Sequence, residues 1–411
     1  MKCYFDNHRR ININTIRQLD TIRSFNDFEF RYCYPSLEFT FSTTYESQGI
    51  YLIEISTHSH LWCSANHHAN SFNLINSIPS HVISAVQLKK LRIVIIAVVE
   101  GDSFVKKDEI DAYKELTSTV RSMNLPQYSV LIISGNLNAE LQYLEWCKNF
   151  NEIPWIEFSE GIDWTGQQNW AKQTDPIFSK SITDAKLLYN SLNRSHRHHR
   201  SEHLYMLAQA NVLDIGLVSG GVWFTDHQSN SPDPIRAPEY IDNISTSEYR
   251  DVLRINYPRT VDSTAESLRT NNPAGISNLN IFKDTLLTVS TESHFNDNQG
   301  LFITEKTFRP IAMGHPFIVL GQPKLLKKLQ SFGFKTDFID TSYDEILDNK
   351  KRFATFHESF LSWINDNKEK YFTKWQLYVE HNLYVYQHTN FRKLYIDDAV
   401  ERTTRYFKES S

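Results

Sequence analysis

Cysteine is scarce in this sequence, and its placement does not suggest cross-linking. The chain has 411 residues and only 4 cysteines, at positions 3, 33, 63 and 147, without a paired spacing. Disulfide-rich domains need a larger, closely spaced set, so this scatter excludes a disulfide framework. Such usage fits a reducing, intracellular compartment, and we therefore expect a cytoplasmic protein.

Long apolar runs are also missing. The first ten residues, MKCYFDNHRR, lack the apolar segment that a secretory signal peptide requires. The longest apolar stretch, residues 93–99 (IVIIAVV), is far shorter than the roughly 20 residues that span a bilayer. We expect no membrane span and interpret this stretch as a buried strand.

The sequence has no excess of positive charge. Its 43 lysines and arginines against 48 aspartates and glutamates give a net charge of -5. This excludes a uniformly basic coat for nucleic acid, although a local basic cleft would escape the average. Hydrophobic residues make up 40% of the chain, which is typical of a folded protein. At this length we expect two lobes, because one hydrophobic core rarely grows so large.

The sequence also lacks the residue spacing of a known metal-binding motif. Donors suitable for zinc cluster near the N-terminus, but their spacing matches no closed four-ligand pattern. The cluster comprises His58, His60, Cys63, His67 and His68. We interpret it as structural and predict no metal.

What is present is an alternation of strand and helix patterns. Residues 1–88 indicate strands and loops, including an alternating run at 51–55. Beyond them the patterns indicate strands at 91–99, 128–134 and 154–158 and helices at 106–123 and 138–150. This order predicts a parallel sheet in an α/β fold.

A polar stretch at 160–181 interrupts the alternation, which then resumes. Strands are expected at 186–192, 285–290, 316–320 and 334–338, and helices at 202–211, 306–313 and 323–332, with loops and short helices over 220–280. From residue 343 the chain is helical and aromatic. We predict an N-terminal lobe at 1–180, a C-terminal lobe at 181–345 and a helical tail at 346–411.

A basic segment follows the expected strand at 186–192. It reads NRSHRHHR over residues 193–200 and precedes an expected helix. Ligands of open parallel sheets bind beyond the carboxyl ends of strands, where helix N-termini attract anions. Arginine forks at that place suit a diphosphate. The alternative is a solvated basic loop or a contact with nucleic acid.

A second segment follows the expected strand at 285–290. Thr304 is placed to cap the helix that Glu305 and Lys306 open. A carboxylate there suits the ribose hydroxyls of a nucleotide and an ammonium suits its phosphates, while Glu292 offers a similar anchor for hydroxyls. The alternative is a well-capped helix with no ligand.

Residues 290–321, STESHFNDNQGLFITEKTFRPIAMGHPFIVLG, resemble the donor-binding motif of the α-1,3-fucosyltransferases. The matching residues are Glu292, Ser293, Ile303, Thr304, Glu305, Lys306, Pro316, Leu320 and Gly321. Upstream, residues 193–207 resemble the loop and helix of that family, which aligns Arg200 with its phosphate-binding arginine. Phe302 stands where the family usually has tyrosine, and residues 296–300 lengthen the loop, so the sugar and the base stay open.

The resemblance implies a GT-B fold, in which two Rossmann-like lobes face a cleft and a C-terminal helical tail packs back across them. It also implies a glycosyltransferase that uses a nucleotide-diphosphate sugar, GDP- or UDP-linked, and requires no cofactor. Transfer in that family is inverting, and no metal-binding Asp-x-Asp motif is suitably placed here. The implied donor-binding residues are Asn193, Arg194, Arg197, Arg200, Glu292, Ser293, Thr304, Glu305, Lys306 and Arg309.

An inverting transfer needs a carboxylate that takes the proton of the acceptor hydroxyl. Glu100 and Asp102 follow the expected strand at 91–99 and are our candidates for the catalytic base, with Glu160 in reserve. An exposed loop pair is the alternative interpretation for both.

A weaker similarity concerns the acceptor. Asn296-Asp297-Asn298 and Phe302-Ile303-Thr304 resemble a run in the DNA β-glucosyltransferases of T-even phages, and residues 333–344 resemble glycosyltransferase-like proteins of phages and giant viruses. These similarities favour a viral origin, with action in the host cytoplasm. The acceptor is then a glycan or a hydroxymethylated pyrimidine in phage DNA.

A DNA acceptor would need a basic channel. Several basic residues near expected strand ends are candidates to line it: Lys89, Lys90, Arg92, Lys106 and Lys107. Solvated ends of secondary structure are the alternative. A different class of function, a noncatalytic nucleotide-sugar or nucleic-acid binding protein, also stays open, as does the oligomeric state.

Overall fold

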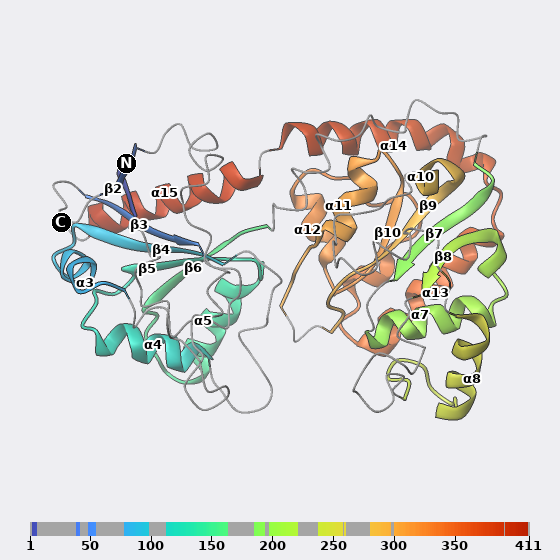
Figure 1. Ribbon diagram of the computed structural model, residues 1–411, viewed down its shortest axis with the longest axis horizontal. Helices are drawn as coiled ribbons and strands as arrows, with labels where there is room; N and C mark the ends of the chain where they lie inside the picture. Colours follow the sequence, from blue (N-terminus) through green and yellow to red (C-terminus); the bar gives the residue numbers. More distant parts are fainter. Residues whose placement is uncertain are drawn as a thin grey trace. The chain divides into compact units, whose positions relative to one another are not determined.

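The structure is a computed structural model (Figure 1). It describes residues 2–5, 38–41, 48–54, 78–97, 112–162, 185–193, 197–220, 237–257, 259, 280–296, 300–389 and 391–409. The chain forms two compact units. The first comprises Met1–Trp164, Asn298–Phe302 and Asn390–Ser411, and the second comprises Thr165–Asp297 and Ile303–Thr389.

The first unit is built on a parallel six-stranded sheet. Its strands are β1 (Lys2–Phe5), β2 (Glu38–Phe41), β3 (Gly49–Glu54), β4 (Leu91–Ala97), β5 (Val130–Ser134) and β6 (Ile156–Glu160). They lie in the order β2-β1-β3-β4-β5-β6, with parallel pairing throughout. β4 and β5 are buried along their whole length. Near-continuous Ile and Val runs of this kind are typical of strands covered on both faces.

Helices cover both faces of this sheet (Figure 1). On one face lie α3 (Ser80–Gln87), α4 (Ala112–Ser122) and α5 (Ala139–Asn149), whose apolar residues share one core with β3 to β6. On the other face lies α15 (Phe391–Glu409), where Tyr395, Ile396 and Ala399 pack against alternate residues of β3, β4 and β5. The last helix of the chain therefore completes the first unit.

The second unit contains a parallel four-stranded sheet. Its strands are β7 (Leu187–Asn193), β8 (Gly216–Gly220), β9 (Thr285–Thr291) and β10 (Phe317–Leu320), in the order β10-β9-β7-β8. After β7 the chain adds β8 on one side and then β9 on the other. The winding direction therefore reverses between β7 and β9. Open α/β sheets bind ligands in the crevice beyond the carboxyl ends of two such strands.

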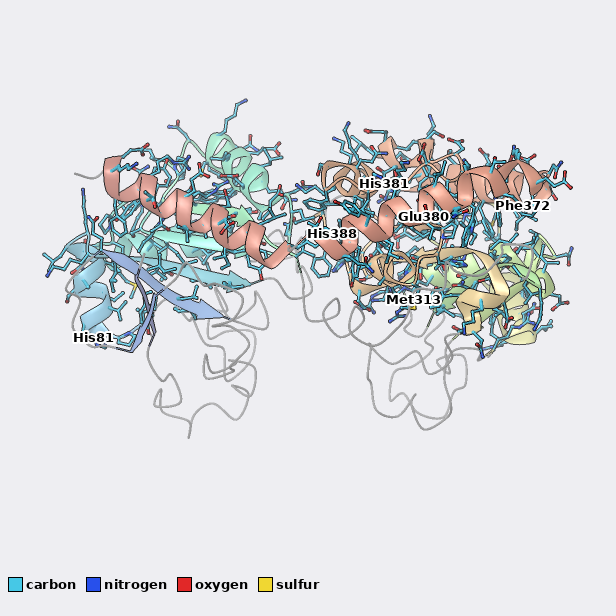
Figure 2. All side chains as sticks on the ribbon, turned by 90° about the horizontal axis from the view of Figure 1, so that it is seen from above. His81, Met313, Phe372, Glu380, His381 and His388 are labelled. Carbon is cyan, nitrogen blue, oxygen red and sulfur yellow. The ribbon has the colours of Figure 1, made fainter. Side chains whose placement is uncertain are left out.

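The helices of the second unit enclose this sheet. They are α7 (His198–Gln209), α8 (Thr246–Asn256), α10 (Asn280–Asp284), α11 (Glu305–Ala312), α12 (Leu325–Ser331), α13 (Asn349–Asn365) and α14 (Glu369–His388). Figure 2 shows α14 passing Met313, which caps the end of α11. The rings of Phe308 on α11 and Tyr386 on α14 lie 6.4 Å apart, and Phe360 on α13 meets Tyr189 on β7 at 5.0 Å. Aromatic packing thus fixes both helices.

Local sequence explains several element boundaries. The Ser245 side chain accepts a hydrogen bond from the Glu248 amide and so starts α8, and Asp348 starts α13 through the Lys351 amide. Gly300 has a φ of 81°, and a Cβ there would come within 2.5 Å of Asn136. Only glycine fits this close, left-handed turn.

The predicted α/β architecture with parallel sheets is confirmed for the described residues, and most predicted elements lie within a few residues of their observed bounds. The prediction of a strand at 334–338 was wrong. Alternate residues there are buried, but the Lys335 amide and carbonyl bond to the Asn382 side chain of α14 instead of to a strand. The strand β8 was not predicted.

Two further expectations differ from the structure. The expected helical tail is divided, because α13 and α14 belong to the second unit and α15 to the first. The helix expected at 202–211 begins earlier, at His198, where the carbonyl of Arg197 accepts the amides of Arg200 and Ser201. The end of the basic segment is therefore helix, not loop.

Candidate functional site

The two segments singled out in the sequence meet at the reversal point between β7 and β9. The hydroxyl of Thr291, at the end of β9, donates to the Asn193 side-chain oxygen, at the end of β7, over 2.7 Å. Arg200, in the first turn of α7, donates to the carbonyls of Thr291 and Glu292 at 3.1 and 2.8 Å. Residues about 100 positions apart are thus joined at one sheet edge.

Arg200 has a different environment from the one expected of a phosphate ligand. Only 3% of the residue is exposed, and one amino group of its guanidinium is used on backbone carbonyls that end β9. In this arrangement Arg200 fixes the end of β9. Its expected contact with phosphate stays a prediction.

His199 supports the same backbone. Its Nε2 lies 2.9 Å from the Glu292 carbonyl, to which it donates, and its ring stacks on Phe295 with centroids 5.3 Å apart. Burial, with Arg200 nearby, lowers the pKa of His199 well below its ordinary value. The ring is therefore neutral and acts as a fixed hydrogen-bond donor.

Glu292 is fully buried and links β9 to the start of α11. One carboxylate oxygen accepts the Thr304 amide at 3.1 Å and the Thr307 hydroxyl, and the other accepts the Thr304 hydroxyl at 2.6 Å and the Ser293 amide at 3.2 Å. A carboxylate satisfied by four donors is a structural clamp. The described contacts of Glu292 are internal, and its expected contact with sugar or ribose hydroxyls stays a prediction.

The turn Thr304-Glu305-Lys306 opens α11, as predicted. Thr304 accepts the Lys306 amide at 3.1 Å and is the N-cap. The ammonium of Lys306 contacts Glu305 at 2.8 Å and Ser293 at 3.4 Å, and the side chains of Glu305 and Lys306 are 18% and 25% exposed. These two charged groups therefore still reach solvent at a helix N-terminus, where anions are favoured.

The electrostatics of this turn keep Glu305 ionised. Burial raises the pKa of Glu305, but attraction to Lys306, their hydrogen bond and the charge of Arg309 together outweigh it. The net pKa is lower than its ordinary value. The turn therefore presents a carboxylate and an ammonium side by side at neutral pH.

Three further predicted donor residues lie in the second unit. Ser293 is 7% exposed, Arg309 is half-buried on α11, and Arg197 is the exposed N-cap of α7. The structure thus brings together Asn193, Arg197, Arg200, Glu292, Ser293, Thr304, Glu305, Lys306 and Arg309 in the second unit.

Other predicted residues are not placed. Arg194 and both candidate bases, Glu100 and Asp102, lie outside the described residues, as do Lys106, Lys107 and the histidine-rich cluster at 58–68. The reserve base Glu160 is exposed at the carboxyl end of β6.

The basic residues proposed for a DNA channel need a correction. Arg92 is fully buried and bonds Glu157 and the Tyr128 carbonyl. Lys89 and Lys90 are exposed but precede β4. They therefore lie at the amino end of this strand.

Sequence reasoning missed Arg352 on α13. This buried side chain donates to the carbonyls of Phe295 and Gly321, which follow β9 and β10, and to that of Ile346. It also lies over the Phe295 ring, 4.4 Å from the centroid. Arg352 thus holds together the loops at the carboxyl edge of the sheet. Its place one turn before Phe356 in an apolar stripe was the available signal.

Also missed was a buried chain of hydrogen bonds behind the site. Ser191 contacts His203 at 3.1 Å, His203 contacts His357 at 2.9 Å, and His357 contacts the Phe353 carbonyl at 2.8 Å. Burial lowers the pKa of His203, aided by His357, and burial lowers that of His357 to about 4.

Neutrality fixes the proton positions in this chain. His357 must donate Nδ1–H to the carbonyl, so its Nε2 accepts from Nδ1–H of His203, whose Nε2 accepts the Ser191 hydroxyl proton. The Ser191 oxygen in turn accepts from the Asn193 side-chain amide at 3.0 Å. Asn193 is therefore held in one orientation by groups extending to α13.

Comparison with known proteins adds no relative. No family model matches the chain, and neither a curated protein nor a solved structure does so. Among the described residues, no helix is long and apolar enough to cross a membrane. Within the same residues, no three His, Cys, Asp or Glu side chains are grouped as metal ligands would be.

Proposed function

We propose that the protein is a glycosyltransferase of the GT-B type that binds a nucleotide-diphosphate sugar in the second unit. One observation carries the proposal. The basic segment after β7 and the Thr304-Glu305-Lys306 turn after β9 flank the point where the sheet reverses its winding. This crevice is where open parallel sheets take nucleotides. The resemblance to the α-1,3-fucosyltransferases supports the same assignment.

Each group of the turn has a role in this proposal. Lys306 and the positive end of the α11 helix dipole attract the diphosphate, and Glu305 accepts hydroxyls of the ribose or of the sugar. Arg200, His199 and Arg352 support the site by fixing the strand ends and loops. A preorganised positive environment stabilises the diphosphate as it leaves.

The reaction is an inverting displacement. The acceptor hydroxyl oxygen attacks the anomeric carbon, the bond from that carbon to the diphosphate oxygen breaks, and a carboxylate takes the hydroxyl proton. Glu100 or Asp102 is our candidate for that carboxylate. A GDP- or UDP-sugar is the proposed donor, with a glycan or a hydroxymethylated pyrimidine in DNA as the acceptor.

Thermal unfolding of the full chain with GDP, UDP, ADP or CMP tests the donor site, because a ligand that binds only the folded state raises Tm. We expect one diphosphate to raise Tm and Lys306→Ala to reduce that rise strongly. Lys327→Ala is the matched control, since Lys327 forms a similar but more exposed pair with Glu345 at 2.9 Å. If the diphosphate raises the Tm of Lys306→Ala and Lys327→Ala equally, Lys306 does not bind the donor.

Transfer is tested separately from binding. The nucleoside diphosphate that gives the largest shift is supplied as its common nucleotide sugars, and release of the free nucleoside diphosphate is measured with glycan and hydroxymethylated DNA acceptors. Release that Glu100→Gln or Asp102→Asn abolishes, with donor binding retained, is the expected result. Binding without any release would favour a noncatalytic nucleotide-sugar binding protein.

A further inference from the structure

The first unit contains a hollow of about 510 Å³ at the amino ends of β4, β5 and β6, which is within the usual size range of small-molecule sites. Its walls come from the segments that precede these strands, from α5 and from the last turns of α15. The lining residues that matter here are Tyr128, Leu144, Glu140, Glu157, Arg402 and Tyr406. None belongs to the site proposed for the sugar donor.

One wall presents an aromatic ring on a strained backbone. Tyr128 has a φ of 62°, a left-handed conformation that is unusual for a bulky residue. Both of its backbone groups are tied, the amide to the Trp155 carbonyl at 2.8 Å and the carbonyl to Arg92 at 3.0 Å. Tyr128 is nevertheless 38% exposed, and Leu144, which also lines the hollow, is 46% exposed. Strain that the surroundings enforce is concentrated at functional positions.

The facing wall holds donors and acceptors in fixed places. Arg402 on α15 contacts Glu140 and Glu157, each at 2.9 Å, and Arg405 contacts Glu157 at 3.1 Å. Because these cations and carboxylates are paired with each other, the wall does not select a ligand of either sign. A ligand with a hydrogen-bonding edge could bridge both kinds of group.

Tyr406 adds a buried aromatic ring to the lining. The residue is only 5% exposed, and Arg92 lies over its ring, 5.1 Å from the centroid. Its hydroxyl is covered by neighbouring atoms and does not open into the hollow. Tyr406 therefore shapes this wall through its ring.

We propose that the hollow is an accessory site for a nucleobase, as part of a nucleoside or of a nucleic-acid strand end. A base is planar and neutral, stacks on tyrosine, and carries donors and acceptors along one edge. Those features match the exposed Tyr128 and the paired charges of Arg402, Glu140 and Glu157. Because α15 supplies one wall, the site is complete only when this helix is docked.

Binding of adenosine, guanosine, cytidine and thymidine to the full chain tests the site, by calorimetry or saturation-transfer NMR. Tyr128→Asn removes the ring but keeps a residue that tolerates the left-handed backbone. We expect it to weaken binding of the preferred nucleoside about 10-fold or more, while Tyr128→Phe retains binding. Tyr384→Asn, which removes an exposed tyrosine from α14 in the second unit, is the control and leaves binding unchanged.

Three results would overturn this assignment. One is the absence of binding by every nucleoside up to about 1 mM. Another is equal nucleoside affinity in the wild type and Tyr128→Asn, once thermal unfolding has shown that both proteins are folded. The third is binding that Lys306→Ala abolishes and Tyr128→Asn does not, which would place the nucleoside in the donor site. Failure here leaves the proposed donor site untouched, because the diphosphate test uses different residues.

Discussion

At the scale of single residues, the candidate site depends on buried charged groups more than on exposed ones. Glu292, Arg200 and Arg352 are each almost fully buried and bond to backbone or hydroxyl groups. Such groups are costly to bury unless every donor and acceptor is matched. Their matching is what gives the carboxyl edge of the second sheet a single shape.

Removing the Glu292 carboxylate should therefore be strongly destabilising. Glu292→Ala leaves the Thr304 and Thr307 donors buried without an acceptor, and we expect the free energy of unfolding to fall by about 2–4 kcal/mol. Chemical denaturation measures this value. The control Glu401→Ala changes an exposed carboxylate on α15 and should alter stability by less than about 0.5 kcal/mol. A similarly small loss at Glu292 would contradict the clamp.

Glu202 makes stability depend on pH. Burial raises its pKa from 4.5 to about 7, against the hydrogen bonds it accepts from the Glu239 and Tyr240 amides. The folded state then holds a proton that the unfolded state releases above pH 4.5, so this contribution to stability falls as the pH rises to about 7 and is constant above it.

Unfolding free energies measured at intervals from pH 4.5 to 7.5 check this dependence. Glu202→Gln should remove about 1–3 kcal/mol of the decline. Asp344, whose pKa burial raises to about 6, contributes in the same direction in both proteins and cancels from the difference. An identical pH profile for wild type and variant would show that Glu202 does not titrate there.

At the scale of elements, α15 is attached to the first unit by two unlike contacts. Apolar residues near its start pack on the sheet, and Arg402 near its end meets Glu140, Glu157 and Asp398. Partly exposed ion pairs of this kind are screened by salt, whereas apolar contacts are not. The two halves of the helix should thus respond differently to conditions.

We expect Arg402→Met to loosen the last turns of α15 first. The variant leaves Glu140 and Asp398 without this cation, whereas Glu157 keeps its contacts with Arg92 and Arg405. Hydrogen exchange of the amides at 400–409 should become about 10-fold faster or more, with a smaller change at 391–399. Lys408→Ala, an exposed change on the same helix, serves as the comparison. An equal increase in hydrogen exchange at 391–399 and 400–409 would contradict this difference between the two halves of α15.

At the scale of the whole molecule, each unit has its own parallel sheet and its own helical layers. The two units are nevertheless not two continuous stretches of the chain. Residues 298–302 and the last helix belong to the first unit although their sequence neighbours belong to the second. Leu301 is held there by hydrogen bonds to Asn136 and Leu137 at 3.0 and 2.8 Å. Residues 300–302 are therefore fixed to the first unit.

This tethering can be tested with the intact chain. In Gly300→Ala the new Cβ would clash with Asn136, and the left-handed backbone disfavours alanine. We expect a stability loss of about 1–3 kcal/mol and faster hydrogen exchange at 300–302, seen by mass spectrometry. Gly333→Ala is the matched control, because its φ is also positive but a Cβ there would meet only Val385 at 3.8 Å. Equal effects on residues 300–302 would exclude a specific tether.

The sequence by itself determined the strands with continuous apolar runs, most helices around them and the cap at Thr304, because these depend on local pattern and local hydrogen bonds. It also indicated which segments follow β7 and β9. Only the tertiary structure decided that Glu292 and Arg200 turn inward, that Asn382 replaces a partner strand at residues 334–338, and that α15 completes the first unit. These outcomes depend on partners distant in the chain, and no local pattern encodes which distant groups will satisfy a buried charge or a free backbone amide.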